Sequence, residues 1–172
     1  MAESAIAFPH SALQRITGRL ADGAIAAAAL ALLGLVVVQG WQVIARYVLN
    51  DSPSWTEPVT LLLLSTAMGL GAAAGVHTRR HFSFSLLAES LAPRGRHALH
   101  LMQSAVIALI GLVLAYWGTL LFVDGVHIPT AGAPMPESIE YLPLAISGAL
   151  MALFALVQAI VPPEAPAEPE AD

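Results

Sequence analysis

The chain has 172 residues, of which 57% are apolar and only 11% are charged, and its mean hydropathy is +0.73. These values are not those of a soluble domain and place the chain in the membrane class. The absence of cysteine excludes disulfides, cysteine-ligated metals and thiol nucleophiles. All seven basic residues are arginine and the formal net charge is -5, so the chain is not expected to bind nucleic acid.

Four apolar runs follow one another along the chain, and each is long enough to cross a membrane. They cover residues 24–45, 58–76, 98–123 and 141–161, and they contain no Asp, Glu, Lys or Arg. About 20 helical residues span the roughly 30 Å of hydrocarbon. Because lipid offers the backbone no hydrogen-bond partner, each run must be a helix. We therefore expect an all-α integral membrane protein, with one four-helix transmembrane domain over residues 1–161.

The segments outside these runs have other patterns. Residues 11–22 carry apolar side chains at helical spacing with arginines between them, which predicts a short interfacial helix. Residues 81–91 are expected to lie along the same interface. The proline-rich segment 124–140 predicts an ordered turn region or a mobile loop, not a fifth helix. Residues 162–172 alternate Pro, Glu and Ala and are expected to be disordered.

The arginines predict that both termini are cytoplasmic. Two precede the first run, Arg46 follows it, four lie between the second and third runs, and none comes later. With the termini inside, six of the seven are cytoplasmic, as the positive-inside rule requires. The first run exceeds the core of a signal peptide, about 7 to 15 residues, so we expect it to be retained. Aromatic residues gather at the ends that are predicted to face outward: Trp41, Tyr47, Trp55, Tyr116, Trp117 and Tyr141.

Small residues at helical spacing mark faces where helices can approach closely. The second run carries Ala67, Gly71 and Gly75 at spacing four. The pattern fits either a specific helix contact or general packing against any neighbour. The same spacing recurs in the later runs, in the pairs Gly111 with Ala115 and Gly148 with Ala152.

Apart from His100, near the start of the third run, the polar residues inside the runs are neutral. A protein that moves ions usually keeps ionisable side chains near mid-membrane, although each costs about 2.5 to 3.5 kcal/mol there. This pattern favours a scaffold or accessory subunit over an autonomous transporter. No catalytic constellation is visible in the sequence either, so an enzyme is not expected. The neutral polar residues include Gln39, Gln42, Gln103, Thr119, Ser147 and Gln158.

The segment between the first two runs carries a resemblance to a known family. Residues 46–50 read R-Y-V-L-N and residues 54–57 read S-W-T-E. They resemble the R-Y-x-x-N and W-x-E-E patterns of the small membrane subunit, of the DctQ type, of tripartite ATP-independent periplasmic (TRAP) transporters. Residues 75–87 resemble that family's helix ending, basic pair and H-I-x-V-D-L-L stretch, and residues 141–148 resemble its last helix. The chain departs from the patterns at Pro58, where a second Glu is usual, and at Ser85, where Asp is usual.

The resemblance implies a division of labour in an inner membrane. A large membrane subunit carries out sodium-coupled transport with an elevator-like motion, and a periplasmic binding protein delivers an organic acid. The small subunit packs beside the large one as a fixed scaffold and holds no cofactor. Its outer loops, around Trp55 and Pro134, are expected near the docked binding protein.

The candidate interface residues cluster around the first helical hairpin. Arg46 and Glu57 are close enough in sequence to pair across it, and the alternative is that both are solvated interfacial charges. Glu57 suits a helix N-terminus, Ser54 or Thr56 can cap that helix, and Pro58 is tolerated in its first turn. The full candidate set is Arg46, Tyr47, Asn50, Trp55, Glu57, Gly71 and Gly75.

Two histidine-based alternatives belong to other classes of protein. His77 and His100 could act as axial ligands of a haem, as in a four-helix cytochrome b-type anchor subunit of a redox complex. His77 and His81 are spaced four apart and could bind a metal, but they lack a third ligand.

Overall fold

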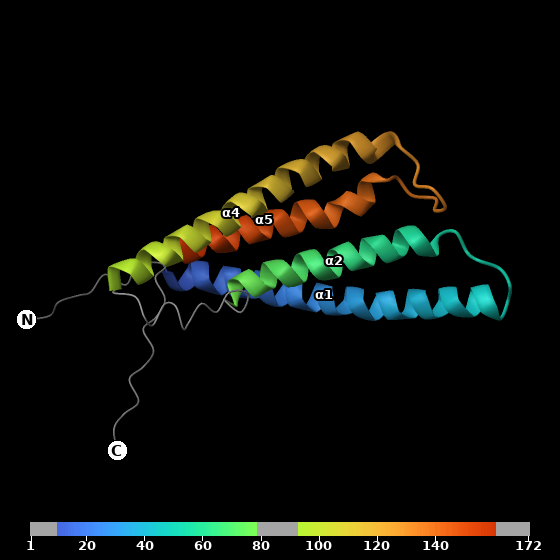
Figure 1. Cartoon of the computed structure of the whole chain (residues 1–172), viewed down its shortest axis with the longest axis horizontal. Coiled ribbons are helices and arrows are strands. Elements are labelled where there is room, and N and C mark those ends of the chain that lie inside the picture. The colour runs from blue at the N-terminus through green and yellow to red at the C-terminus, as the bar shows by residue number, and fades with distance from the viewer. Residues whose placement is uncertain (1–9, 79–92, 161–172) are drawn as a thin grey trace, which may run out of the picture.

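The computed structural model describes residues 10–78 and 93–160, and within these ranges it contains helices and no strand. The predicted all-α fold is confirmed for this part of the chain. Its elements, shown in Figure 1, are α1 (His10–Tyr47), α2 (Thr56–His77), α4 (Pro93–Asp124), the short 3-10 helix η1 (Gly125–His127) and α5 (Ser138–Ile160).

Four of these helices are long and apolar enough to cross a membrane, which confirms the four predicted spans. α2 has 22 residues and α5 has 23, so each is about 33 to 35 Å long at about 1.5 Å per residue. That length matches a hydrocarbon layer of about 30 Å. α1 has 38 residues and α4 has 32, so both are longer than the layer is thick.

The prediction of a separate interfacial helix over residues 11–22 is wrong. This segment is helical, but it continues into the first span as part of α1. Neither proline nor a run of turn residues interrupts the sequence there, and the lone glycines Gly18 and Gly23 are tolerated inside a helix. Since nothing stops the hydrogen-bond ladder, one long helix forms.

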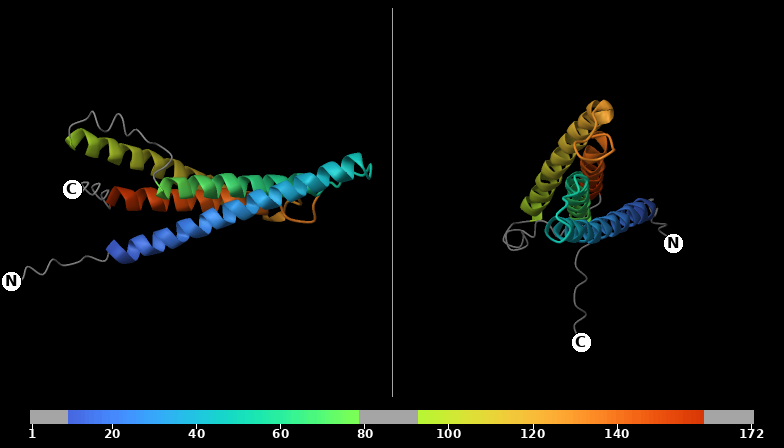
Figure 2. Two further views of the ribbon diagram at one scale, coloured as in Figure 1. Left: turned by 90° about the horizontal axis from the view of Figure 1, so that it is seen from below. Right: turned by 90° about the vertical axis from the view of Figure 1, so that its right-hand side faces the viewer.

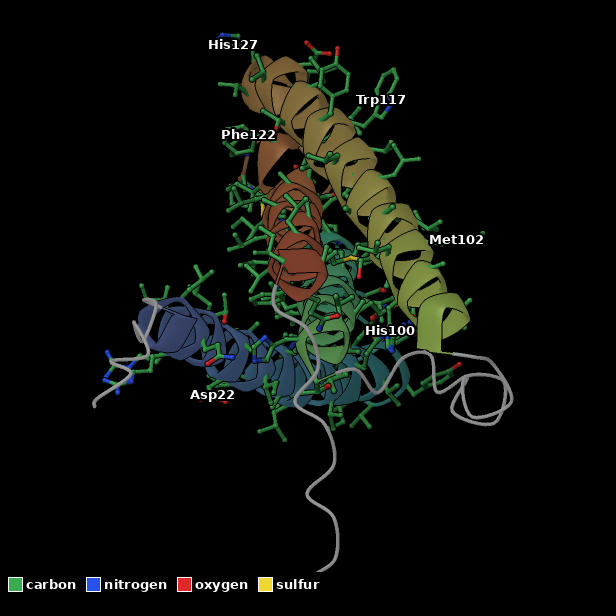
Figure 3. The ribbon with its side chains drawn as sticks, turned by 90° about the vertical axis from the view of Figure 1, so that its left-hand side faces the viewer. Asp22, His100, Met102, Trp117, Phe122 and His127 are labelled. Carbon is green, nitrogen blue, oxygen red and sulfur yellow. The ribbon has the colours of Figure 1, made fainter. Side chains whose placement is uncertain are left out.

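The helices are arranged with α2 and α5 in the centre. α1 packs on α2, and α4 packs on α5. α1 and α4 therefore form two flanks, which diverge where α1 and α4 begin (Figures 2 and 3). The connections 48–55 and 125–137 lie together at the other end of the molecule, which we call the loop end. The end where α1 begins and α5 ends is called the opposite end.

Glycines bring the backbones of α4 and α5 into direct contact. A Cβ atom on Gly111 would lie 2.6 Å from the Ala152 nitrogen, and one on Gly148 would lie 2.5 Å from the Ala115 nitrogen. Gly118, seven residues after Gly111, meets α5 in the same way. The pairs Gly111 with Ala115 and Gly148 with Ala152 thus face each other, which confirms a specific contact rather than general compatibility.

The opposite end is held by contacts between α2 and α5. The Gln158 amide donates hydrogen bonds to the carbonyl oxygens of Val76 (2.5 Å) and His77 (3.2 Å). These carbonyls lie in the last turn of α2, where the regular helical hydrogen bonds run out. The His77 ring also packs against Phe154, with 5.1 Å between ring centroids, and Phe154 is buried in a cluster that draws on all four spans: Ala21, Ala73, Val76, Ala108, Phe154 and Ala155.

The proline-rich segment after α4 is an ordered turn, which decides between the two predicted forms. η1 continues α4 for one turn, and Pro129 and Pro136 then form an isolated antiparallel bridge. The Thr130 N–H donates to the Met135 carbonyl and the Glu137 N–H donates to the Ile128 carbonyl, both at 2.9 Å. The predicted interfacial segment 81–91 and the predicted disordered tail 162–172 lie outside the described residues.

Candidate functional site

The loop end of α1 is shaped by Asn50. Its φ is 52°, in the left-handed region that few residues other than glycine adopt. The Asp51 N–H donates to the Ala45 carbonyl at 3.0 Å, and the Val48 N–H donates to the Ile44 carbonyl at 2.8 Å. Asn50 therefore ends α1 and turns the chain, in the way that glycine or asparagine ends many helices. The asparagine of the R-Y-x-x-N pattern thus has a role within the chain itself.

Replacing Asn50 tests this role. Asn50→Ala is expected to lower the free energy of unfolding by about 1 kcal/mol, because an alanine Cβ is disfavoured in the left-handed region. Asn50→Gly is expected to be neutral or slightly stabilising, since glycine adopts this φ freely. Unfolding with a denaturing detergent, followed by tryptophan fluorescence, measures both. Equal losses for alanine and glycine would assign the importance of Asn50 to its side-chain amide instead.

The start of α2 differs from the prediction. Trp55 occupies the N-cap position and no side chain caps the helix, so the predicted capping by Ser54 or Thr56 is wrong. Both hydroxyls donate to carbonyl oxygens elsewhere: Thr56 to Pro53 at 2.8 Å, and Ser54 to Gly132 at 3.0 Å. Pro58 is buried in the first turn of α2, where its missing N–H leaves no bond unmade.

The bond from Ser54 joins the two loops at the loop end. Gly132 accepts it in a backbone conformation with φ +88°, and a Cβ on Gly132 would lie 2.6 Å from the Ser54 carbonyl oxygen. Only glycine satisfies both conditions. Gly132 lies in the segment 124–140, which the sequence predicts as an ordered turn region or a mobile loop. Nothing in the sequence reveals its contact with a residue 78 positions away.

A polar groove of about 370 Å³ opens between α1 and α2 at the loop end. Side chains from the last turns of α1, from the connecting loop and from the first turns of α2 form its walls. All are polar or charged except one proline. They are Gln39, Gln42, Arg46, Ser52, Pro53, Ser54, Thr56, Glu57 and Thr60.

Arg46 and Glu57 line this groove from different helices. The described residues contain no ion pair between them, and both side chains are exposed. An ion pair between Arg46 and Glu57 in the membrane stays a prediction. Deeper in the hairpin, the Thr60 hydroxyl is buried and has no hydrogen-bond partner among the described residues. The groove therefore offers one positively charged and one negatively charged side chain.

The remaining candidate residues lie outside the groove. Tyr47 and Trp55 are exposed at the loop end. Gly71 faces open space, since a Cβ there would meet nothing within 4 Å, whereas a Cβ on Gly69 would lie 2.6 Å from the Ser147 hydroxyl oxygen. Gly69 is thus the glycine that α2 uses against α5. In the sequence, Gly69 and Ala73 are two small residues spaced four apart, and this spacing could have identified the face. Ala73 is fully buried in the structure.

The histidines of the cytochrome alternative both lie toward the opposite end, His77 in the last turn of α2 and His100 near the start of α4. The His77 ring packs on Phe154 of α5. His100 is exposed on α4 near the opposite end, as Figure 3 shows. His81, the other member of the candidate metal pair, lies outside the described residues.

The four long apolar helices define a multi-pass membrane protein. Residues 35–162, most of the chain, match the DctQ component of tripartite ATP-independent periplasmic transporters. The chain belongs to this family, and the identification made from its sequence patterns is confirmed. This membership favours a transporter subunit over the cytochrome alternative.

One curated relative is the sialic acid TRAP transporter small permease protein SiaQ of Vibrio cholerae. The two chains are 27% identical over 84 residues, which cover 48% of this chain and 49% of SiaQ. The matched region of the chain thus spans about half the length of this relative. The likeness supports a small permease subunit and leaves the transported solute open.

Proposed function

We propose that this chain is the fixed scaffold of a TRAP transporter, packed beside a large membrane subunit that performs the transport. The observation that carries the proposal is the absence of Asp, Glu, Lys and Arg from the apolar runs 24–45, 58–76, 98–123 and 141–161. Coupling to an ion gradient requires groups that bind the ion within the membrane, and ionisable side chains inside a span are the sequence feature that marks such an ion pathway. The coupling, which we take to be to sodium, therefore belongs to the partner.

The arrangement of the helices supports a scaffold. In each span, at most 33% of the most apolar stretch is buried within the chain, so most of its residues keep some surface for lipid or another protein. α1 and α4 form separate flanks, and each presents a long apolar face. Gly71 adds a place on α2 where a foreign helix backbone can approach closely, because none of the described residues fills it.

The loop end supports contact with a periplasmic binding protein that delivers an organic acid. The bond between Ser54 and Gly132 ties the two loops together, so they offer one surface instead of two independent segments. Trp55 is exposed on the first loop and Pro134 on the second. With both termini cytoplasmic, as the arginines predict, this surface faces the periplasm.

Co-purification tests the proposal. The tagged full-length chain, co-expressed with a large TRAP membrane subunit, is expected to bring that subunit down in mild detergent. Gly71→Leu is expected to reduce the recovered partner severalfold, because the added side chain fills the space left for a neighbouring helix. Gly40→Leu is the matched control, since Gly40 on α1 also meets nothing within 4 Å.

Two results would count against the scaffold. The first is the failure of the wild-type chain to recover a large subunit, and the second is the accumulation of an organic acid by vesicles that contain this chain alone. Equal losses for Gly71→Leu and Gly40→Leu would remove Gly71 from the interface but leave the scaffold in place.

A further inference from the structure

The polar groove between α1 and α2 contains one positively and one negatively charged side chain, and neither forms an ion pair among the described residues. Arg46 closes it on the side of α1 and Glu57 on the side of α2, without an ion pair between them among the described residues. Two other groove hydroxyls are already engaged, Ser54 with Gly132 and Thr56 with Pro53. The two charged side chains can therefore bind a ligand that carries a negative group and a positive group.

The groove also extends into the hairpin. Gln39 lies seven residues before Arg46 on α1, which corresponds to about 10 Å along a helix axis. On α2, Thr60 lies nearly one turn beyond Glu57, and its buried hydroxyl lacks a partner in the described residues. Buried polar atoms are nearly always hydrogen-bonded in native proteins. The Thr60 hydroxyl is an exception among the described residues, and because it has no accessible surface, the polar side chain that a ligand can reach at this depth is that of Gln39.

Beneath the groove the helix surface becomes apolar. Leu61, Leu64 and Met68 follow Glu57 along one face of α2 and are exposed by 52%, 38% and 68%. On α1, Val43 and Val36 lie beside the groove residues and are exposed by 56% and 70%. A surface with paired charges above a long apolar face has the polarity of a phospholipid, whose headgroup lies at the membrane surface and whose acyl chains extend inward.

We infer that the groove binds the headgroup of a phospholipid with a primary ammonium group, of the phosphatidylethanolamine class. Arg46 binds the phosphate, because a guanidinium forms paired hydrogen bonds with phosphate oxygens. Glu57 accepts from the ammonium, and Gln39 or Gln42 hydrogen-bonds the ester oxygens. A phosphatidylcholine headgroup has no N–H for Glu57, and an anionic headgroup without an amine leaves that carboxylate unpaired.

The inference is tested by lipid retention in native mass spectrometry of the delipidated full-length chain. We expect phosphatidylethanolamine to be retained about tenfold or more over phosphatidylcholine of the same acyl chains, since hydrogen bonds to charged groups discriminate by about this factor. Arg46→Gln and Glu57→Gln should each lower this preference about tenfold. Arg15→Gln is the matched control, because Arg15 is also exposed on α1 but lies near the opposite end.

Several outcomes would overturn the inference. They are equal retention of the two lipids by the wild-type chain, equal effects of Arg46→Gln and Arg15→Gln, and binding of water-soluble phosphoethanolamine as tightly as the lipid. Displacement of the lipid when the large subunit binds would show that partner side chains occupy the groove instead. If Arg46→Gln does not fold, the comparison of lipids on the wild-type chain decides alone. None of these results bears on whether the chain is a scaffold.

Discussion

Gly148→Ala is expected to destabilise the isolated chain by about 1 to 3 kcal/mol, the usual cost of an added methyl group in a packed contact. The new Cβ would lie 2.5 Å from the Ala115 nitrogen and 2.8 Å from the Gly111 carbonyl oxygen. Both are backbone atoms of α4, so no side chain can rotate away and the two helices must separate. Unfolding with a denaturing detergent, followed by tryptophan fluorescence, measures the loss.

Gly71→Ala is the matched control, because Gly71 also lies inside a membrane helix but has open space around it. Alanine favours a helix over glycine by about 0.5 to 1 kcal/mol, so the control is expected to be neutral or slightly stabilised. The contrast between two identical substitutions isolates the contact of α4 with α5. Equal stability of the two variants would show that this contact does not hold the helices together.

The four spans could be predicted from the sequence because lipid leaves an apolar run of this length only one conformation. The helix ends could not, since polar residues continue a helix as well as apolar ones where no proline stops it. α1 shows this, because it begins at His10, fourteen residues before the apolar run at Ala24. The composition predicted which residues cross the membrane, but it did not predict how far the helix extends beyond them.

The packing order of the helices was not predictable from spacing alone. α2 carries small residues on more than one face, and the stripe through Gly71 and the face through Gly69 look equally suited to a contact. Shape complementarity with α5 selects Gly69, because Ser147 lies against it. In α4 and α5 the choice was simpler, since Gly111 and Gly148 are each followed by alanine four residues later and the two pairs face each other.

The candidate site was predicted in part. Placing Arg46 and Glu57 near each other followed from the short connection between their helices, and the structure places both in one groove. The capping roles of Ser54 and Thr56 failed because each hydroxyl has another carbonyl within reach. One of these acceptors, Gly132, belongs to the distant loop, and local sequence carries no information about it.

Gly132→Ala is expected to separate the two loops, which makes it the most direct test of the loop end as one surface. Alanine at φ +88° costs about 1 to 2 kcal/mol, and its Cβ would collide with the Ser54 carbonyl oxygen. Ser54→Ala removes only one hydrogen bond, worth about 0.5 to 1.5 kcal/mol, and should have a smaller effect. The substitution is therefore expected to release the second loop from the first.

The lack of native cysteine makes this separation measurable with spin labels. Labels at Ser52→Cys and Ala131→Cys, two exposed positions on the two loops, are expected to give a narrow distance distribution in the parent chain and a broad one with Gly132→Ala. Gly40→Ala serves as the control, because Gly40 contacts nothing within 4 Å. An unchanged distribution in Gly132→Ala would mean that α2 and α5 alone position the loops. The junction would then add nothing to the surface proposed for the binding protein.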